Sequence, residues 1–487
     1  MTLTAPRPGV QARAIESRPL RNPDAGSPEV MTRRGWWLVV LNFLIPGSAQ
    51  ILAGSRRLGR FGLGATLVMW TLLAIAALAG LLWPTGLFTV VTGSFLPDFL
   101  AAVRPVPLTL VQIALFAYIG LWIVLTVDTL RLVRLVRVGP LARVAMAIVA
   151  VVLLFFSGSG AAWAAGVAGS TRDALSSLFA QSGPVVPPSD GYYNILLLGA
   201  DSGEGRDSMR FDSISVVSIN ADTGATTITG IPRDMPHFPF APGPMQDRYP
   251  DGHTGYADPT CGWGSGINQL KTEVEVCQDG NALYPDAEAN DSEPGIEATK
   301  DAAEGILGIQ IPYYVLIDMK GFAEMIDALG GVDINVQERL PKGGPAYDGQ
   351  PVDDWAFGWI EPGQQHMDGD TAQWYARSRY TTSDFDRMRR QRELQEAVLA
   401  QFTPQVVLTR FQEVAKSTTS LVQTDLPQSL IAPTLVDLAL KAKDQTINTL
   451  ELTPAGGVDE FDPDYAQVQQ MVRDALHPAS ETEAPAS

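Results

Sequence analysis

The sequence predicts an α/β fold class, in which a central mixed sheet is covered by helices on both faces and preceded by an N-terminal α-helical membrane region. Three observations predict this arrangement. The first third holds apolar stretches long enough to cross a bilayer, the part after residue 190 alternates strand and helix patterns, and the two parts differ in charge. Strands that alternate with helices favour a sheet covered on both faces. A chain of 487 residues is long enough for two or three such units.

Charge is divided unevenly along the chain. The formal net charge is −18, yet residues 1–170 hold 14 Arg, no Lys and only five acidic residues, whereas the remainder holds 21 basic against 48 acidic residues. Acidity on this scale excludes nucleic acid as an expected partner, because binding to a phosphate backbone needs a net basic surface. The arginines of the acidic part are therefore the informative ones.

Membrane signals fill the first part. Residues 1–34 are polar and predict a disordered cytoplasmic tail, and residues 35–167 predict the membrane region. Three spans are expected at about 61–83, 108–130 and 144–167. Each is close to the ~20 apolar residues that cross a bilayer.

A fourth apolar stretch, 36–53, is interrupted at Pro46 and Gly47 and has arginines on both sides. Positively charged flanks stay in the cytoplasm, so we expect this stretch to be re-entrant. Three spans then leave the C-terminal domain outside the cell, in a multi-pass protein of the cell membrane. The alternative is four spans with a cytoplasmic C-terminal domain.

The two cysteines, Cys261 and Cys277, both fall in the acidic part. An external domain favours a disulfide between them, since such bonds persist in oxidising compartments. Two buried free thiols would fit the reversed topology. The spacing of Cys and His does not match a structural zinc site.

After the membrane region we expect a linker over 168–190, a domain over 191–477 and a disordered tail over 478–487. Residue patterns predict strands at 193–198, 213–219, 226–229, 313–317 and 332–336, and helices at 299–307 and 321–329.

Acidic and basic residues gather where the first three strands begin and end. Asp201 follows the first strand in a Gly-rich turn, Arg210 and Asp212 introduce the second, and Arg233 and Asp234 follow the third. Ligands of open α/β sheets bind beyond the carboxyl ends of the strands. Carboxylates among arginines suit a hard cation such as Mg²⁺ that bridges phosphate oxygens. Taken singly, Asp201 and Asp212 read more readily as turn or capping residues.

A second constellation lies within residues 376–392. Ser383 can cap a helix that starts near Asp384, and on that helix Asp384, Arg387 and Gln391 share one face by their i, i+3, i+7 spacing. That face becomes apolar further along the helix, so its polar end is expected to point into a pocket.

Four more arginines flank this face. Arg377 and Arg379 precede the helix and could close over the same site, whereas Arg389 and Arg392 project elsewhere and are expected to be surface charge. Guanidinium groups bind phosphate oxygens in pairs, so several of them predict a pyrophosphate or polyphosphate ligand. No GxSxG element or Cys nucleophile setting supports acyl transfer.

These segments resemble the LytR-CpsA-Psr family of cell-wall ligases, of the actinobacterial type. The matching stretches are Asn194–Asp201, Arg210–Ile214, Ile231–Asp234, Tyr314–Phe322, Ile326–Asp333, Met367–Ala372 and Tyr375–Gln391. The resemblance implies a hydrophobic groove for a polyprenyl chain beside a cationic site. It also implies dependence on Mg²⁺ (or Mn²⁺), and transfer of a polyprenyl-pyrophosphate-linked glycopolymer to a peptidoglycan acceptor at the bilayer.

Roles follow from the resemblance position by position. Asp201 and Asp212 look like the metal-side carboxylates, and Asp384 looks like the partner that orients the arginines. The pyrophosphate site would comprise Arg210, Arg233, Asp234, Arg377, Arg379, Arg387 and Gln391. Hydrolysis by a polyprenyl-pyrophosphate pyrophosphatase, and binding without catalysis by an anchored receptor or regulator, are the alternative functions.

Three departures from the family pattern stand out. Phe211 occupies a position that commonly holds Ser or Thr, and the region 236–298 is long and carries the two cysteines. The membrane part is also larger than the single span usual in the family. The choice of acceptor is where we expect these departures to matter.

Overall fold

The structure is a computed structural model. It describes residues 20–21, 23–96, 98–178, 185–201, 210–347, 349–401, 422–430, 434–442 and 445–478. The chain divides into two compact units, residues 1–91 with 106–169, and residues 92–105 with 170–487. Most of the predicted tails, 1–34 and 478–487, lies outside the described residues, although helix α2 already begins at Pro28.

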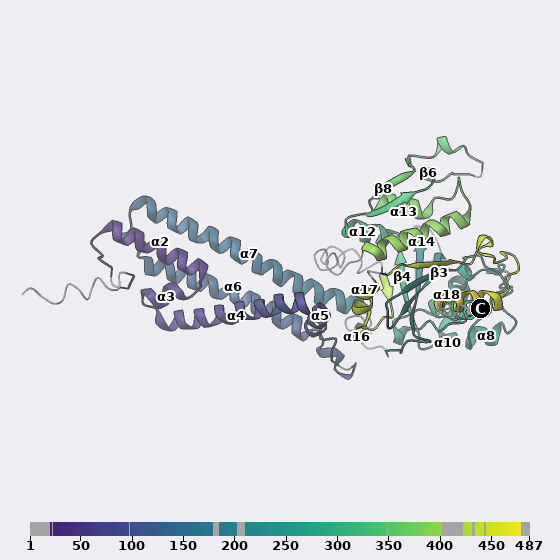
Figure 1. The fold of residues 1–487 in the computed structure, drawn as a ribbon, viewed down its shortest axis with the longest axis horizontal. Coiled ribbons are helices and arrows are strands. Elements are labelled where there is room, and N and C mark those ends of the chain that lie inside the picture. Colours follow the sequence, from purple (N-terminus) through teal and green to yellow (C-terminus); the bar gives the residue numbers. More distant parts are fainter. Residues whose placement is uncertain are drawn as a thin grey trace, which may run out of the picture. The chain divides into compact units, whose positions relative to one another are not determined.

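The first unit is helical (Figure 1). Its helices are α2 (Pro28–Leu44), α3 (Ser48–Ala53), α4 (Arg56–Leu82), α5 (Pro84–Thr92), α6 (Val106–Val133) and α7 (Pro140–Leu178). Within the described residues, three helical stretches are long and apolar enough to cross a membrane, Arg56–Leu82, Val106–Arg137 and Pro140–Asp173. They coincide with the three spans that the sequence predicts. Helix α7 continues to Leu178, into the segment 168–190 that we expected to be a linker.

The interrupted stretch 36–53 forms the end of α2, a turn and the short helix α3. Gly47 makes the turn at φ 93°, and a Cβ there would lie 2.3 Å from the Leu63 nitrogen of α4, so only glycine fits. Gln50 of α3 donates to the Leu125 carbonyl (2.7 Å) and to Thr129 Oγ1 (2.8 Å) on α6. Buried hydrogen bonds therefore attach this hairpin to α6.

The second unit is built on a six-stranded mixed sheet in the order β10-β3-β2-β1-β4-β9. These strands are β1 (Tyr192–Asp201), β2 (Arg210–Asn220), β3 (Thr226–Gly230), β4 (Tyr313–Asp318), β9 (Val422–Thr424) and β10 (Asn448–Glu451). Pairs β1–β4 and β10–β3 are parallel, and the other neighbours are antiparallel. The mixed sheet of the predicted fold class is confirmed.

Alternate side chains of β1 pack on opposite faces of the sheet. Leu196 and Leu198 belong to a buried core with α11 (Pro294–Leu307) and α18 (Tyr465–Leu476), whereas Ile195 packs on the other face with Leu426 and Leu430. Helix α14 (Asp384–Gln401) covers that other face next to β2, where Gln395 Nε2 donates to Ser215 Oγ at 3.2 Å. Helices therefore cover both faces, as predicted.

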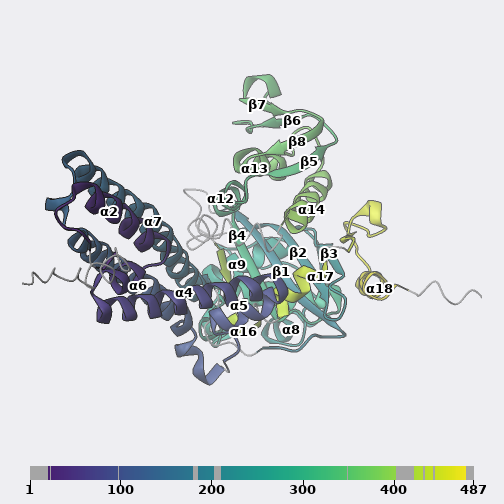
Figure 2. The same ribbon diagram turned by 60° about the vertical axis from the view of Figure 1, so that its left-hand side comes forward.

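A smaller layer lies beyond α14. It contains α12 (Met319–Leu329), α13 (Gly369–Arg377) and the two-stranded pairs β5–β8 and β6–β7. The bounds of these strands are β5 (Val332–Val336), β6 (Leu340–Lys342), β7 (Gly358–Ile360) and β8 (Gly363–Met367). Figures 1 and 2 both show α14 between this layer and the large sheet. Short helices complete the unit: α8 (Pro244–Arg248), α9 (Leu270–Thr272), α10 (Gly280–Leu283), α16 (Gln428–Leu430) and α17 (Val436–Ala442).

Candidate functional site

A cluster of charged side chains surrounds Arg233 at the end of the large sheet. Arg233 follows β3, and its guanidinium binds the carboxylates of Asp212 from β2 (2.5 Å), Asp234 (3.2 Å) and Asp384 from α14 (3.6 Å). Residues from the two constellations of the sequence, which lie about 150 positions apart, thus meet at one place. We refer to Arg233, Asp212, Asp234, Asp384 and Arg387 as the arginine–aspartate cluster.

A β-bulge places Asp212 in this cluster. In the β1–β2 register Gly199 pairs with Ser213 and Ala200 pairs with Phe211, so Asp212 is the extra residue. A bulge redirects side chains and often lies beside a functional site. It also explains why Phe211 and Ile214, three residues apart, are both fully buried in the same core.

A capping box fixes the start of α14. Ser383 Oγ accepts from the Asp386 nitrogen at 3.1 Å, and the Asp386 carboxylate accepts from the Ser383 nitrogen at 2.9 Å. The predicted helix start at Asp384 is therefore confirmed, with Ser383 as its cap. The first turn then presents Asp384 and Arg387 together, and Arg387 NH2 donates to Asp384 Oδ2 at 3.0 Å.

Burial and charge perturb both arginines of the cluster. Burial lowers the pKa of Arg387, the adjacent charge of Arg233 lowers it further, and the carboxylates of Asp384 and Asp212 oppose this. For Arg233, burial acts to lower the pKa, but Asp384, Asp234 and Asp212 raise it overall. Arg387 is only 5 % exposed, and its Nε has no hydrogen-bond partner among the described residues. A buried guanidinium with an unused donor is suited to an anionic ligand.

Gln391 lies one turn further along the same face of α14. Its Nε2 donates to the Ala376 carbonyl at 3.3 Å, and its buried Oε1 has no partner in the described part of the chain. The face shared by Asp384, Arg387 and Gln391 thus carries two orphaned polar atoms, as a ligand-facing surface would.

The structure distributes the remaining predicted residues around the cluster. Arg379 is exposed yet close enough to Arg387 to lower its pKa. Arg377 lies over the Trp374 ring, 5.4 Å from its centroid. Arg210 is exposed at the start of β2, where its backbone pairs with Asp201. The side chain of Asp201, like the Gly-rich turn 202–209, lies outside the described residues.

One prediction on α14 was wrong. Arg392 is not surface charge: it is only 2 % exposed and faces the sheet, where NH2 donates to Ser213 Oγ at 3.3 Å. Small residues opposite, Ser213 and Gly230, leave the space that its guanidinium fills. Arg389 does lie at the surface, where it pairs with Glu393 at 2.9 Å.

Asn268 is a member of the site that the sequence did not reveal. Its nitrogen donates to the Arg233 carbonyl at 3.1 Å, and its Nδ2 donates to Asp234 Oδ1 at 3.2 Å. It belongs to the long region 236–298, and no spacing pattern connects it with Arg233. Only the fold brings the two together.

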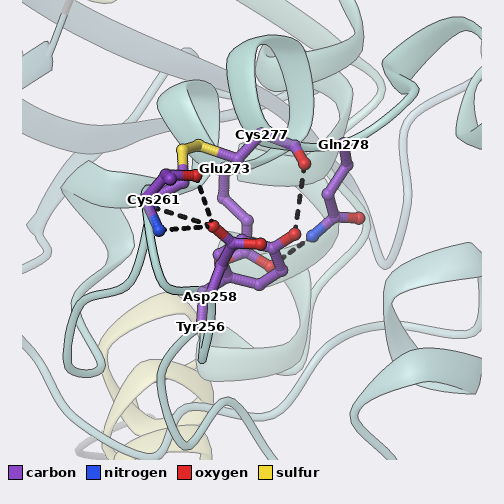
Figure 3. Close-up of a disulfide and its surroundings, with 7 residues drawn as sticks. Tyr256, Asp258, Cys261, Glu273, Cys277 and Gln278 are labelled. Carbon is purple, nitrogen blue, oxygen red and sulfur yellow. Dashed lines mark hydrogen bonds between the residues drawn. A yellow bond between two sulfur atoms is a disulfide. The ribbon is translucent and has the colours of Figure 1, made fainter.

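The disulfide between Cys261 and Cys277 is confirmed, with Cα atoms 6.0 Å apart (Figure 3). Tyr256 donates its hydroxyl hydrogen to the Cys277 carbonyl at 3.1 Å, and Asp258 Oδ1 accepts from the Cys261 nitrogen at 3.0 Å. The same region also holds the basic residue Lys271, but it is buried in ion pairs with Glu275 and Glu293.

The carboxylates of the cluster are of the ligand type that a hard cation prefers, but all three of them bind Arg233. Asp212, Asp234 and Asp384 offer carboxylate oxygens, the ligands that Mg²⁺ prefers. Among the described side chains no group of three or more His, Cys, Asp or Glu is arranged to hold a metal. The two residues predicted to bind the metal, Asp201 and Asp212, lie where the end of β1 pairs with the start of β2. The side chain of Asp201 falls outside the described residues.

The model of the LytR_cpsA_psr family matches residues 167–237 and 277–478, more than half of the chain. The chain belongs to the LytR_cpsA_psr family. Both parts of the arginine–aspartate cluster fall within the matched segments, and residues 238–276, with Asn268 and Cys261, fall between them. The actinobacterial type stays a prediction.

Individual LytR_cpsA_psr relatives are distant. The polyisoprenyl-teichoic acid–peptidoglycan teichoic acid transferase TagU of Bacillus mycoides is 25% identical over 242 residues, which are 48% of this chain and 60% of that protein. Biofilm regulatory protein A of Streptococcus mutans is 25% identical over 50% of this chain and 52% of its own length. The match therefore spans about half to three fifths of these curated relatives. Among solved structures, protein gbs0355 of Streptococcus agalactiae is 22% identical, with a TM-score of 0.41, over 58% of this chain and 88% of that one.

Proposed function

We propose that this protein is a phosphotransferase that moves a polyprenyl-pyrophosphate-linked glycopolymer onto peptidoglycan. The observation that carries the proposal is the buried Arg387, whose Nε has no hydrogen-bond partner within the described part of the chain and which lies beside Arg233 in a LytR_cpsA_psr domain. The name of the Bacillus mycoides relative, a teichoic acid transferase, supports the same class of reaction. Three helices of spanning length in the same chain suit a lipid-linked donor.

The arginines would neutralise the pyrophosphate. Arg233 and Arg387 are fixed by Asp384, and the more exposed Arg379, Arg377 and Arg210 would add contacts as the donor binds. Gln391 would accept a hydrogen bond from the head group through Oε1, which has no partner among the described residues. Planar guanidinium groups bind phosphate oxygens in pairs, which orients as well as neutralises them.

Asp201 and Asp212 are the residues that would hold Mg²⁺, or Mn²⁺ in its place. A divalent ion there supplies positive charge to the oxygens of the reacting phosphate. Asp212 would then exchange part of its present ion pair with Arg233 for the metal.

The reaction is an in-line displacement at phosphorus. The oxygen of a peptidoglycan sugar hydroxyl forms a bond to the phosphorus nearest the polymer, while the bond from that phosphorus to the bridging oxygen breaks. Polyprenyl phosphate leaves with the bridging oxygen, and the hydroxyl proton passes to a base. Asp234 is our candidate for that base, because its carboxylate is 66% exposed and that of Asp384 is 37% exposed. Such transfer depends on positioning and charge stabilisation more than on a protein nucleophile.

Three spans with a cytoplasmic N-terminus would place the catalytic domain outside the cell, where peptidoglycan lies. The disulfide supports this side of the membrane, because it needs an oxidising compartment.

The experiment uses the full chain in detergent with a polyprenyl-pyrophosphate-linked oligosaccharide and soluble peptidoglycan fragments, with Mg²⁺ or with EDTA. Covalent attachment of the oligosaccharide, dependent on Mg²⁺ and lost in Arg387→Ala, is the expected result. Release of phosphorylated sugar without attachment would replace the proposal by a pyrophosphatase. Lipid binding without turnover would replace it by a receptor or regulator.

A further inference from the structure

A loop that lies largely outside the segments matched by the LytR_cpsA_psr model contacts the arginine–aspartate cluster. We call residues 254–277 the disulfide loop, since the bond between Cys261 and Cys277 closes it. Almost all of it falls between the two segments that match the LytR_cpsA_psr model. The match to the family model therefore gives no information on the function of the disulfide loop.

The disulfide loop contains an open cavity of about 730 Å³. Tyr256, Trp263, Asp258 and Pro259 are among the residues that line it. The Tyr256 and Trp263 rings lie 5.7 Å apart with their planes tilted by 41°. Aromatic rings beside polar backbone and a carboxylate form a surface on which an amphipathic ligand can stack and hydrogen-bond.

The cavity is preformed. Tyr256 and Trp263 exchange two backbone hydrogen bonds of 2.9 Å, and the Tyr256 hydroxyl binds the Cys277 carbonyl. Beneath the loop, His253 and Glu273 form a fully buried pair at 2.9 Å. Figure 3 shows Tyr256 and Asp258 gathered beside the disulfide. A surface held in place in this way loses little conformational freedom when a ligand binds.

The disulfide loop continues directly into the cluster. Ser265 Oγ accepts from the His237 nitrogen at 3.0 Å, shortly after Arg233 in the chain. Asn268, in the same loop, binds both the Arg233 carbonyl and the Asp234 carboxylate. The loop that carries the cavity thus contacts, through Asn268, the residues that would bind the donor.

The charge of the cavity lining distinguishes between the two glycans of the proposed reaction, the lipid-linked donor and the peptidoglycan acceptor. Asp258 is the charged side chain among the residues that line the cavity, whereas Glu273 is buried against His253 and Glu275 pairs with Lys271. A lining that carries a carboxylate and no basic side chain disfavours the pyrophosphate group of the donor. Aromatic faces instead favour the C–H faces of sugar rings, which carry slight positive charge.

We propose that the cavity of the disulfide loop binds the amino-sugar backbone of the peptidoglycan acceptor beside the cluster. This inference rests on the proposed function, and names the part of the chain that selects its acceptor. Trp263 supplies the stacking surface, and the disulfide keeps that surface in place.

The test measures KM for soluble peptidoglycan fragments and for the lipid donor, separately, with the full chain in detergent. Trp263→Ala should raise the acceptor KM about tenfold, with donor KM and kcat at saturating acceptor within twofold. Ala257→Leu should act in the same direction, because it fills an exposed position in the cavity without removing a contact. Phe461→Ala, which removes an exposed ring elsewhere, is the matched control. An intact disulfide by mass spectrometry shows that each variant keeps the loop.

Two kinetic results overturn the inference while the proposed function stands: an acceptor KM unchanged in both cavity variants, or a rise in donor KM instead. If the wild-type chain transfers no oligosaccharide to peptidoglycan, the inference is tested by binding to peptidoglycan instead. Retention of insoluble peptidoglycan by the wild type but not by Trp263→Ala supports the inference, and equal retention contradicts it.

Discussion

Arg233 and Arg387 bind opposite oxygens of one carboxylate. Arg233 NH2 lies 3.6 Å from Asp384 Oδ1, and Arg387 NH2 lies 3.0 Å from Asp384 Oδ2. Two guanidinium groups are thereby held close together despite their mutual repulsion. Burial is the main cause of the lowered pKa of Arg387, and the charge of Arg233 lowers this pKa further. A ligand with several negative charges would relieve that repulsion, so the pair is arranged in advance for one.

Removal of the shared charge should therefore impair activity more than stability. We expect Asp384→Asn to lower kcat/KM for transfer by at least about tenfold, because the two arginines lose their common anchor. Asp386→Asn is the matched control: it lies on the same turn but caps Ser383 and pairs with Arg389. It should cost about 1 kcal/mol of stability and leave kcat/KM within about threefold. Equal kinetic loss in both variants would contradict a specific role for Asp384.

The buried Arg392 is predicted to be structural. Its guanidinium and the Glu451 carboxylate both lie against Gly230. A Cβ at that position would be 3.2 Å from Arg392 NH1 and 2.7 Å from Glu451 Oε2. Burial lowers the pKa of Arg392, and the charge of Glu451 opposes this. Arg392→Ala should cost about 2–5 kcal/mol, because it leaves a cavity between α14 and the sheet and removes the hydrogen bond to Ser213. Arg389→Ala, on the exposed side of α14, should cost under about 1 kcal/mol. Thermal unfolding of the two variants in detergent tests the contrast.

Much of the second unit follows from the sequence, and the exceptions have identifiable causes. Period-two patterns predict β5 at Val332–Val336, and Ser383 marks the start of α14. Helical spacing shows which residues share a face, but it says nothing of what faces them. The burial of Arg392 depends on small residues contributed by β2 and β3, and the position of Asp212 depends on a bulge in the β1–β2 register.

Phe211 illustrates the same limit. The sequence marks this residue as a departure from the expected family pattern, and its side chain is fully buried in the core. The sequence shows the departure, and only the register shows that Phe211 turns away from the ligand side. Asn268 is the converse case, since a residue without any local signal binds two members of the cluster.

The disulfide should stabilise the second unit measurably. Its two cysteines are 16 residues apart, so the chain-entropy estimate is roughly 3 kcal/mol, or about 6–12 °C in Tm. We expect Cys261→Ser with Cys277→Ser to lower Tm by that amount, and a reducing agent to do the same to the wild type but not to the double variant. A Tm unaffected by both treatments would show that the bond contributes nothing to the fold.

Asp301 predicts a pH dependence of stability. Burial raises its pKa to about 6, while a hydrogen bond from Tyr284 at 2.6 Å acts to lower it. A carboxyl whose pKa is raised in the folded state stabilises the fold at low pH, and this contribution is lost as pH rises from about 4 through 6. Asp301→Asn should remove it. The difference in the free energy of unfolding between wild type and variant should therefore change by on the order of 2 kcal/mol between pH 4.5 and pH 7.5. A constant difference across that range would contradict the assignment.

The most direct test of the arginine–aspartate cluster is the affinity of the full chain for polyprenyl pyrophosphate in lipid nanodiscs. Arg387→Ala should weaken binding by about 10- to 100-fold, because a charge-assisted hydrogen bond to phosphate contributes roughly 1.5–3 kcal/mol. Arg389→Ala, which removes an equal charge from the outer side of the same helix, should leave the affinity within about twofold. Equal affinities for wild type and Arg387→Ala would contradict the claim that this cluster binds the pyrophosphate.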